Sequence, residues 1–317
     1  MSRVVTHQLT GAHPGSRSVT VGLIQMKMES ETAHNLSNAL EKIAEAAARG
    51  AQIVCLPELF MSRYFCQTKD DKPAFDSAEQ IPSGPTASAL SDAAKKHQIV
   101  LVGGSLFEVV EGPTSPGFAF ATPMLRGARK FFNTAPVFDA DGSFMGAYRK
   151  THIPEDILYH EKQYFSTGDT GIKVFHTRFG NICPLICYDQ WYPEASRIAA
   201  LKGAEIIFYP TAIGLIDQSV EANITGDWEQ MWRNAQLGHA ASNNVYICAL
   251  NRVGKEGAIA FWGGSFVADP SSAILAQAGH QEEIVIVTCD LGRVKALQDA
   301  WMFLKNRRPD TYEALTQ

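Results

Sequence analysis

Short apolar runs and amphipathic stretches alternate along the first third of the chain. Residues 18–28 form a β-rich run, and residues 35–50 repeat apolar positions at helical spacing until the stretch ends at Gly50. An almost wholly apolar strand, AQIVCLPE, comes next. Beyond a polar, aromatic-rich loop at residues 60–83, the pattern predicts a helix at TASALSDAAKKH and a strand at QIVLVGGSLFE. This order of strands and helices is typical of a layered α/β architecture.

The rest of the chain keeps the same rhythm after a Pro- and Gly-rich segment at residues 111–127, which predicts a loop or insertion. The run FFNTAPVFDADGSFMGAYRK is typical of a hairpin that turns at Asp141-Gly142. Further strands are predicted at IKVFHT, NICPLICYD, AEIIFYP, NVYICALNRV, AFWGGSFVADP, ILAQA and EIVIVTCDL, and helices at YPEASRIAALKG and WEQMWRNAQLGHAASN. Because no break in composition divides the chain, we predict a flexible tail over residues 1–17 and one α/β domain over residues 18–317.

Composition and charge narrow the classes of partner. The chain has 317 residues, 45% of them hydrophobic, and a formal net charge of −5 without any block of like charges. This balance argues against nucleic acid or an anionic membrane as a partner. Residues 1–17 lack the apolar core of a signal peptide, and no apolar run reaches membrane length. We therefore expect a cytoplasmic protein.

The cysteines do not predict a metal centre. They stand at positions 55, 66, 183, 187, 248 and 289. None forms a Cys-x-x-Cys pair, and no histidine pair follows at zinc-finger spacing. Several lie inside apolar runs, where a cysteine is ordinarily a small buried hydrophobic residue in a reduced compartment.

Three residues interrupt the pattern where predicted strands end. Glu58 closes IVCLPE, Lys150 closes GAYRK and Cys187 closes PLIC. A cysteine thiolate attacks electron-poor carbon, a carboxylate moves the proton, and an ammonium holds the developing oxyanion, so the three types form one chemical set. Each residue alone is ordinarily a packed core cysteine or a solvated loop residue.

A resemblance strengthens the chemical interpretation. The segments LPELF, YRKTHIP and ICYDQWYPEASR are similar to the three signature segments of the nitrilase, or carbon–nitrogen hydrolase, superfamily, and they occur in the expected order. The similarity extends from about Val19 through GAEIIFYPTAIG and NRVG to RRPDTY. Within the superfamily the chain most resembles N-carbamoylputrescine amidases. This implies a four-layer α-β-β-α sandwich that hydrolyses N-carbamoylputrescine to putrescine, carbon dioxide and ammonia in polyamine synthesis.

The resemblance also implies roles for individual residues. Glu58 would be the general base, Lys150 the oxyanion holder and Cys187 the nucleophile of an acyl-enzyme, with no metal or organic cofactor. Glu161 would position the substrate and the lysine, although a surface residue in a charged turn is the alternative, and the backbone N–H of Tyr188 would be a second oxyanion donor. Further candidates for substrate binding are Tyr64, Trp191, Asp217 and Glu221.

Other expectations concern assembly and supporting residues. Members of the superfamily commonly pair, so we expect a homodimer or higher homo-oligomer through the helices starting near Tyr192 and Trp228 and the tail through Tyr312. Residues interpreted as structural rather than catalytic are His152, Asp189, Glu194, Trp232 and His239.

Two departures from the family pattern bear on these expectations. Pro184 removes a ladder donor from a strand that should be interior, so we expect either a later start of the strand or a bulge. Leu215-Ile216 stand where plant-type carbamoylputrescine amidases carry Ser-Glu, whose acid suits the distal amine. The alternatives are therefore a carbamoyl-amino-acid amidase, an ω-amidase or a nitrilase with the same triad, or a catalytically silent binding protein.

Overall fold

The computed structural model describes residues 17–111, 129–217, 219–220 and 226–317. Three parts of the sequence interpretation therefore lie outside the described residues. These are the predicted tail up to residue 16, nearly all of the Pro- and Gly-rich segment, and Glu221.

A seven-stranded sheet forms one inner layer. Its strands are β1 (Ser18–Gln25), β2 (Ile53–Cys55), β3 (Val100–Val102), β4 (Leu106–Glu111), β5 (Arg129–Phe138), β6 (Phe144–Arg149) and β16 (Glu283–Asp290). Their order is β16-β1-β2-β3-β5-β4, and β6 also pairs with β5. Strands β1, β2 and β3 are parallel, whereas β16, β4, β5 and β6 join through antiparallel pairs. The hairpin predicted to turn at Asp141-Gly142 is confirmed as β5–β6.

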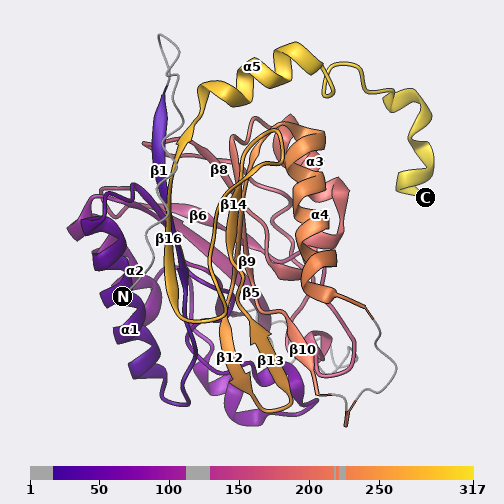
Figure 1. Ribbon diagram of the computed structural model, residues 1–317. Coiled ribbons are helices and arrows are strands. Elements are labelled where there is room, and N and C mark those ends of the chain that lie inside the picture. Colours follow the sequence, from indigo (N-terminus) through magenta and orange to yellow (C-terminus); the bar gives the residue numbers. More distant parts are fainter. Residues whose placement is uncertain (1–16, 112–128, 218, 221–225) are drawn as a thin grey trace.

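A six-stranded sheet forms the second inner layer. Its strands, in order, are β15 (Ile274–Gln277), β14 (Phe266–Ala268), β11 (Tyr246–Asn251), β9 (Ile206–Thr211), β8 (Asn181–Pro184) and β7 (Phe175–His176). Strands β11, β9 and β8 are parallel. At the carboxyl end of β9 and β11 lies a smaller sheet of β10 (Gly214–Ile216), β13 (Ile259–Trp262) and β12 (Val253–Glu256), as Figure 1 shows.

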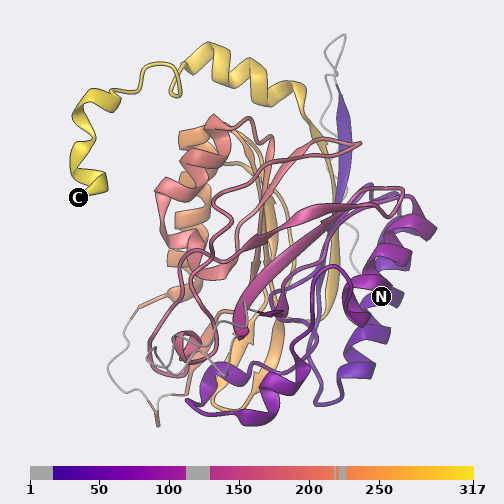
Figure 2. The same cartoon turned by 180° about the vertical axis from the view of Figure 1, so that it is seen from behind.

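Helices cover the outer face of each sheet, so the predicted four-layer α-β-β-α sandwich is confirmed (Figures 1 and 2). Helices α1 (Thr32–Ala48) and α2 (Pro85–His97) pack on the seven-stranded sheet, and α3 (Pro193–Leu201) and α4 (Trp228–Asn243) pack on the six-stranded sheet. Apolar positions at helical spacing place one stripe of each helix against its sheet.

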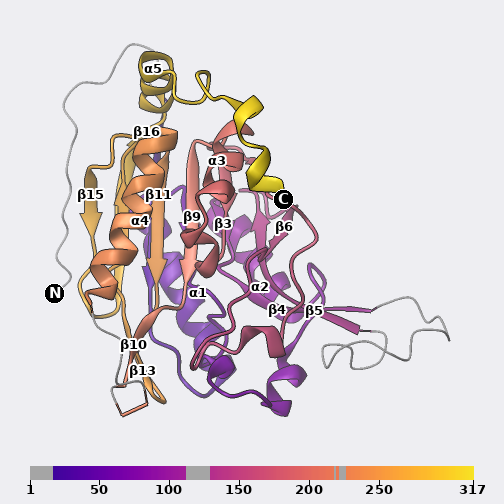
Figure 3. The same ribbon diagram turned by 90° about the vertical axis from the view of Figure 1, so that its right-hand side faces the viewer.

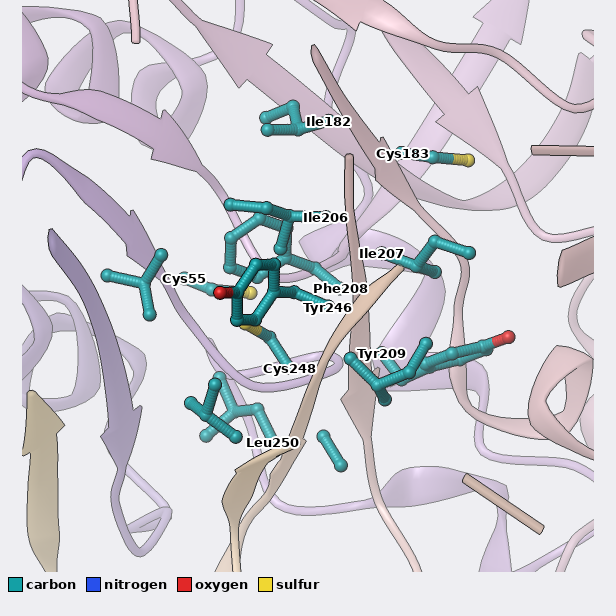
Figure 4. Packing of buried hydrophobic residues seen from close by; sticks show 14 of the residues in the cluster. Cys55, Ile182, Cys183, Ile206, Ile207, Phe208, Tyr209, Tyr246, Cys248 and Leu250 are labelled. Carbon is teal, nitrogen blue, oxygen red and sulfur yellow. The ribbon is translucent and has the colours of Figure 1, made fainter. Parts of the chain in front are cut away.

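The two sheets meet through alternate side chains of their central strands. Leu23 and Cys55 from one sheet, and Phe208 and Cys248 from the other, belong to one buried cluster and are each 0% exposed. Figure 4 shows Cys55, Phe208 and Cys248 together in this layer. Burying a large apolar side chain contributes about 1.5–3 kcal/mol. This core fixes the strand ends that carry the polar residues described below.

The C-terminal segment leaves the sandwich. Helix α5 (Gly292–Trp301) crosses one end of the molecule, and residues 302–317 continue past the side of α3 (Figures 1 and 3). Most of these tail residues are exposed. None of the described helices combines the length and apolarity that crossing a bilayer requires.

The prediction of one strand at QIVLVGGSLFE is wrong, because Gly103-Gly104 divides it into β3 and β4. Gly104 has φ +59°, and a Cβ at this position would lie 2.1 Å from the carbonyl oxygen of Pro57. Only glycine allows so close a backbone approach with this dihedral angle. The glycine therefore lets the chain after β3 lie directly against Pro57, the residue before Glu58.

Two other predicted strands are shorter than the apolar pattern indicates. Only Phe175 and His176 of IKVFHT are in β7, and NICPLICYD is in β8 only as far as Pro184. From Cys187 to Trp191 the chain forms a 3-10 helix. The strand therefore does not reach the cysteine, although Cys183 packs in the buried core as predicted.

Both structures predicted for Pro184, a late start of the strand and a bulge, are wrong. Strand β8 begins at Asn181 and pairs with β9 in regular register through Pro184. The next residue, Leu185, donates its N–H to the Phe208 carbonyl of β9 at 2.8 Å. Because backbone donors alternate in direction, the nitrogen of Pro184 faces the opposite edge, where β7 pairs only as far as Ile182. The missing N–H therefore costs no ladder hydrogen bond.

Candidate active site

Three charged side chains from distant parts of the chain meet in the interior. Glu58 follows β2, Lys150 directly follows β6, and Glu161 begins the 3-10 helix Glu161–Gln163. All three side chains are 0% exposed. Lys150 Nζ donates to Glu58 Oε1 at 2.8 Å and to the two carboxylate oxygens of Glu161 at 2.9 and 2.7 Å. Glu161 is therefore a buried partner of the lysine and does not lie in a solvated turn.

The two carboxylate oxygens of Glu58 have different surroundings. Oε1 accepts hydrogen bonds from Lys150 Nζ and from Asn133 Nδ2, each at 2.8 Å. Oε2 is buried and has no hydrogen-bond partner among the described residues. A buried carboxylate oxygen without a partner is unfavourable, so Oε2 is a strong acceptor for any proton donor that enters the site. Glu58 is thus held through one oxygen and available through the other.

Burial and mutual charge set the protonation of this cluster. Burial raises the pKa of Glu161 to about 7, although the ammonium of Lys150 opposes this rise. Burial lowers the pKa of Lys150, but the carboxylates of Glu161 and Glu58 outweigh burial and raise this pKa well above its usual value. Lys150 therefore remains an ammonium at neutral pH, where it can stabilise a developing negative charge.

Cys187 occupies a sharp turn between β8 and the 3-10 helix Cys187–Trp191. Its φ is +44°, in the left-handed region that residues with a side chain rarely adopt. Cys187 is 6% exposed, whereas each of the other five cysteines is 0% exposed. Its Sγ lies 3.9 Å from the carbonyl oxygen of Ala212, which follows β9. All six cysteines lie in the described ranges, and Cys187 is the least deeply buried of them.

The thiol of Cys187 lies in the electrostatic field of the charged cluster. Burial raises its pKa well above the usual value, Glu58 and Glu161 raise it further, and Lys150 lowers it. Such a thiol is neutral at neutral pH and becomes a nucleophile when a base takes its proton. A thiol, a carboxylate with an unpaired oxygen and a buried ammonium are together equipped for acyl transfer at a carbonyl or nitrile carbon.

Tyr64 and Tyr188, two of the candidate residues, lie beside this centre. The Tyr64 side chain is buried, and its hydroxyl donates to Glu161 Oε1 at 2.7 Å. Tyr188 follows the cysteine and is half-buried. Its backbone N–H lies at the start of the 3-10 helix, where the first N–H groups have no acceptor within the helix.

Trp191 and Asp217 have other contacts. Trp191 is half-buried and packs against the large buried cluster that includes Phe208 and Cys248. Asp217 is exposed, accepts a hydrogen bond from the Ser219 hydroxyl at 2.8 Å, and lies 3.8 Å from Lys255 Nζ. The carboxylate proposed to hold a cationic tail therefore already has partners.

The two histidines interpreted as structural both make side-chain hydrogen bonds. His152 Nδ1 lies 2.7 Å from Asp189 Oδ1. His239 Nε2 lies 2.7 Å from the carbonyl oxygen of Gln190, and the indole N–H of the buried Trp232 donates to the Gln190 side chain at 2.7 Å. Glu194 lies in the first turn of α3, as the helix-dipole argument predicted.

Sequence reasoning missed Asn133 and Arg252. Asn133 fixes Glu58 as described above, and the buried guanidinium of Arg252 donates to the carbonyl oxygens of Glu58 and Leu59 at 2.6 and 2.8 Å. Leu59 has φ +47°, so this contact stabilises a strained turn directly after the carboxylate. Neither residue stands out in the sequence, because Asn133 lies beside Thr134 and Arg252 lies beside Asn251.

Two further features concern cavities and metal sites. A cavity of about 300 Å³ is lined by residues that include Leu59, Ser105 and Phe107, but neither Cys187 nor the charged cluster lines it. Within the described ranges, no group of three or more His, Cys, Asp or Glu side chains is arranged to hold a metal ion.

Comparisons with known proteins agree with this geometry. Residues 20–299 match the protein family described as carbon-nitrogen hydrolase. The chain is 37% identical to an N-carbamoylputrescine amidase of Solanum lycopersicum, with 95% of each chain covered. It is 35% identical to a citrullinase of Francisella tularensis, which covers 95% of this chain and 99% of the relative. A solved carbon-nitrogen hydrolase from Helicobacter pylori G27 superimposes with a TM-score of 0.81 at 34% identity, covering 95% of this chain and 99% of that one.

Proposed function

The chain belongs to the carbon–nitrogen hydrolase family of the nitrilase superfamily, and from this premise we propose that it hydrolyses N-carbamoylputrescine through a covalent intermediate on Cys187. The observation that carries the proposal is a buried Glu58–Lys150–Glu161 cluster in which Glu58 Oε2 has no partner among the described residues, and whose three charges all act on the thiol of Cys187. A silent binding protein would have no need for this unpaired oxygen.

In the first half of the reaction, the sulfur of Cys187 bonds to the carbonyl carbon of the substrate while Glu58 Oε2 takes the thiol proton. The ammonium of Lys150 and the N–H of Tyr188 hold the resulting oxyanion. The carbon–nitrogen bond then breaks, and Glu58 returns the proton to the departing nitrogen. The products of this half are one amine and a carbamoyl thioester.

In the second half, water replaces the departed amine. Glu58 takes a proton from the water as its oxygen attacks the thioester carbon, and the same two donors hold the oxyanion again. The carbon–sulfur bond breaks, the sulfur regains a proton, and the carbamic acid that leaves decomposes to carbon dioxide and the second amine. Glu161 and Tyr64 keep Lys150 in place through the hydrogen bonds described above.

Two observations support a substrate of this class. Relatives at 36–38% identity from several plants are N-carbamoylputrescine amidases, and they cover almost the whole chain. A solved amidase variant from Nesterenkonia sp. AN1, 25% identical to this chain with a TM-score of 0.70, carries the acetamide moiety of fluoroacetamide covalently on its active-site cysteine. We propose the corresponding covalent attack by the sulfur of Cys187 on the carbonyl carbon of the substrate.

Citrulline is the second candidate substrate. The citrullinase relative at 35% identity is consistent with this choice. Both candidates are ureido compounds, so the chemistry at Cys187 is the same.

A substrate panel tests the proposal. We expect the purified protein to release both ammonia and carbon dioxide from N-carbamoylputrescine, with a kcat/KM at least about 10-fold above that for citrulline, simple amides or nitriles. A reversed preference for citrulline would contradict the first substrate, and release of a carboxylic acid alone would contradict ureido chemistry altogether.

We also propose that the protein forms a homodimer. The outer surface of α3 exposes Ile198 and Leu201, that of α4 exposes Met231, and the C-terminal tail exposes Phe303 and Leu315. Exposed apolar residues gathered on one side are typical of an association surface. Sedimentation should give about twice the 34.7 kDa of one chain, and Met231→Glu should shift the protein towards the monomer. A wild-type monomer at micromolar concentration would refute this proposal.

Neither the predicted cytoplasmic location nor the predicted single domain is tested by these observations, and both stay predictions.

A further inference from the structure

Asp189 is a buried carboxylate that contacts two different parts of the site. It is 0% exposed and lies two residues after Cys187. Its Oδ2 accepts from the N–H of Ile186 at 2.9 Å and from the Tyr148 hydroxyl at 2.8 Å. Its Oδ1 accepts from the N–H of His152 at 3.0 Å and lies 2.7 Å from the Nδ1 of the same residue. Oδ2 therefore joins the segment before Cys187 to the segment before Lys150. Oδ1 contacts only His152, in the segment after Lys150.

The contacts between Asp189 and Ile186 enclose Cys187. Ile186 donates its N–H to the side chain of Asp189, and Asp189 donates its own N–H to the carbonyl of Ile186 at 3.0 Å. These two reciprocal bonds close a short loop that contains only Cys187 and Tyr188. The left-handed conformation of Cys187 costs about 1–2 kcal/mol, so it persists because the surrounding bonds hold it.

The contacts of Asp189 with Tyr148 and His152 hold the turn that carries Lys150. Tyr148 and His152 each lie two residues from Lys150 in sequence, one before it and one after it. The Tyr148 hydroxyl oxygen also lies 2.9 Å from Thr151 Oγ1, whose hydroxyl donates to it, and it accepts from the N–H of Thr151 at 3.2 Å. The turn that presents Lys150 is therefore wrapped around the carboxylate of Asp189.

We propose that Asp189 is a positioning residue that sets the distance between the sulfur of Cys187 and the ammonium of Lys150. The inference rests on the proposed function, because it assigns Asp189 to the geometry of the same reaction. Asp189 touches neither substrate nor sulfur. It acts because its side chain joins the loop around the nucleophile to the turn around the oxyanion holder. A misplacement of about 1 Å in such a pair lowers the rate about 100-fold.

The main test is Asp189→Asn, which keeps the size of the side chain but replaces one acceptor oxygen with a donor. We expect kcat to fall about 100-fold with KM changed less than about threefold, because alignment is lost while binding is kept. The rate at which iodoacetamide alkylates Cys187 should fall at least about 10-fold, because the thiol moves away from Glu58. Tyr148→Phe, which removes one of the donors, should give an intermediate loss of kcat.

Asp269 provides the matched control. It is also a buried aspartate, 2% exposed, and it accepts from the N–H groups of Ser271 and Ala273 at 2.9 and 3.0 Å and pairs with Arg293 at 2.8 Å. It follows β14 and has no contact with the site residues. Asp269→Asn should therefore lower Tm by an amount similar to that of Asp189→Asn, but should leave kcat and the alkylation rate unchanged.

The outcomes separate the inference from the proposed function. If Asp189→Asn keeps both kcat and the alkylation rate within about threefold of wild type, Asp189 does not position the site. If Asp269→Asn loses as much of both as Asp189→Asn does, the effect is one of general stability, and the inference is again wrong. If wild type hydrolyses no substrate in the panel, the proposed function fails, while the alkylation rates still show whether Asp189 positions Cys187.

Discussion

Replacing Cys187 with alanine should lower turnover of the best substrate by at least about 10⁴-fold, because no other group in the site can form the covalent intermediate. The protein should remain folded, since the side chain lost is small and Cys187 already adopts an unfavourable backbone conformation. Mass spectrometry after incubation with substrate should show a carbamoyl adduct on wild type during turnover and none on the variant. Circular dichroism should show the same fold for both proteins.

Cys183 offers the control for this experiment. It lies four residues upstream in the same apolar segment, and it is fully buried in the core. Cys183→Ala should cost about 1 kcal/mol of stability as a small core cavity and should retain activity within about twofold. Equal loss of activity in both variants would mean that the segment needs its packing rather than its thiol. Retained turnover in Cys187→Ala would end the proposed mechanism.

The sequence predicted best the helices and hairpins whose structure is decided by the residue pattern within one segment. Helix α4 coincides with the predicted WEQMWRNAQLGHAASN, and the β5–β6 hairpin turns at Asp141-Gly142. In these elements, periodicity and turn residues act within one segment. The prediction of a strand through the whole of NICPLICYD was wrong because β8 ends where its pairing with β9 ends. The buried turn that follows is as apolar as the strand, so the sequence pattern does not mark the boundary.

The same distinction applies to the site. Glu58, Lys150 and Cys187 were found because ordered motifs carry them, and the structure brings the first two into contact. The supporting contacts of Arg252 with the Glu58 turn join segments almost 200 positions apart, and no local pattern encodes such a pairing. The burial of Glu161 was equally hidden, because its neighbours in sequence are polar while its neighbours in space are Lys150 and Tyr64.

The charge balance of the buried cluster makes Lys150 its most sensitive member. Two buried carboxylates, Glu58 and Glu161, face a single ammonium, so the cluster carries net negative charge when all three groups are ionised. Removing one partner of a buried pair leaves uncompensated charge and typically costs about 3–5 kcal/mol. The structure therefore predicts that loss of the lysine harms stability as well as chemistry.

Lys150→Met, which keeps much of the length and apolar volume, should lower kcat about 10³-fold, because the oxyanion loses its charged donor. The free energy of unfolding should also fall, and the deficit relative to wild type should grow as pH rises above about 7, because the wild-type Glu161 carboxyl ionises there in the folded state and the variant's does not. This pH dependence comes from Glu161. In the wild type the ammonium of Lys150 opposes the effect of burial, so without it the folded-state pKa of Glu161 rises further above its value in the unfolded chain. Stability is then greatest while the carboxyl is protonated in both states, and is lost as pH rises towards the folded-state pKa. Lys202→Met, which removes an exposed lysine bonded to the Ile172 carbonyl, should change neither kcat nor this pH dependence. Denaturant unfolding at several pH values measures the deficit, and a deficit that shrinks with rising pH would show that Glu161 does not depend on Lys150 for its charge.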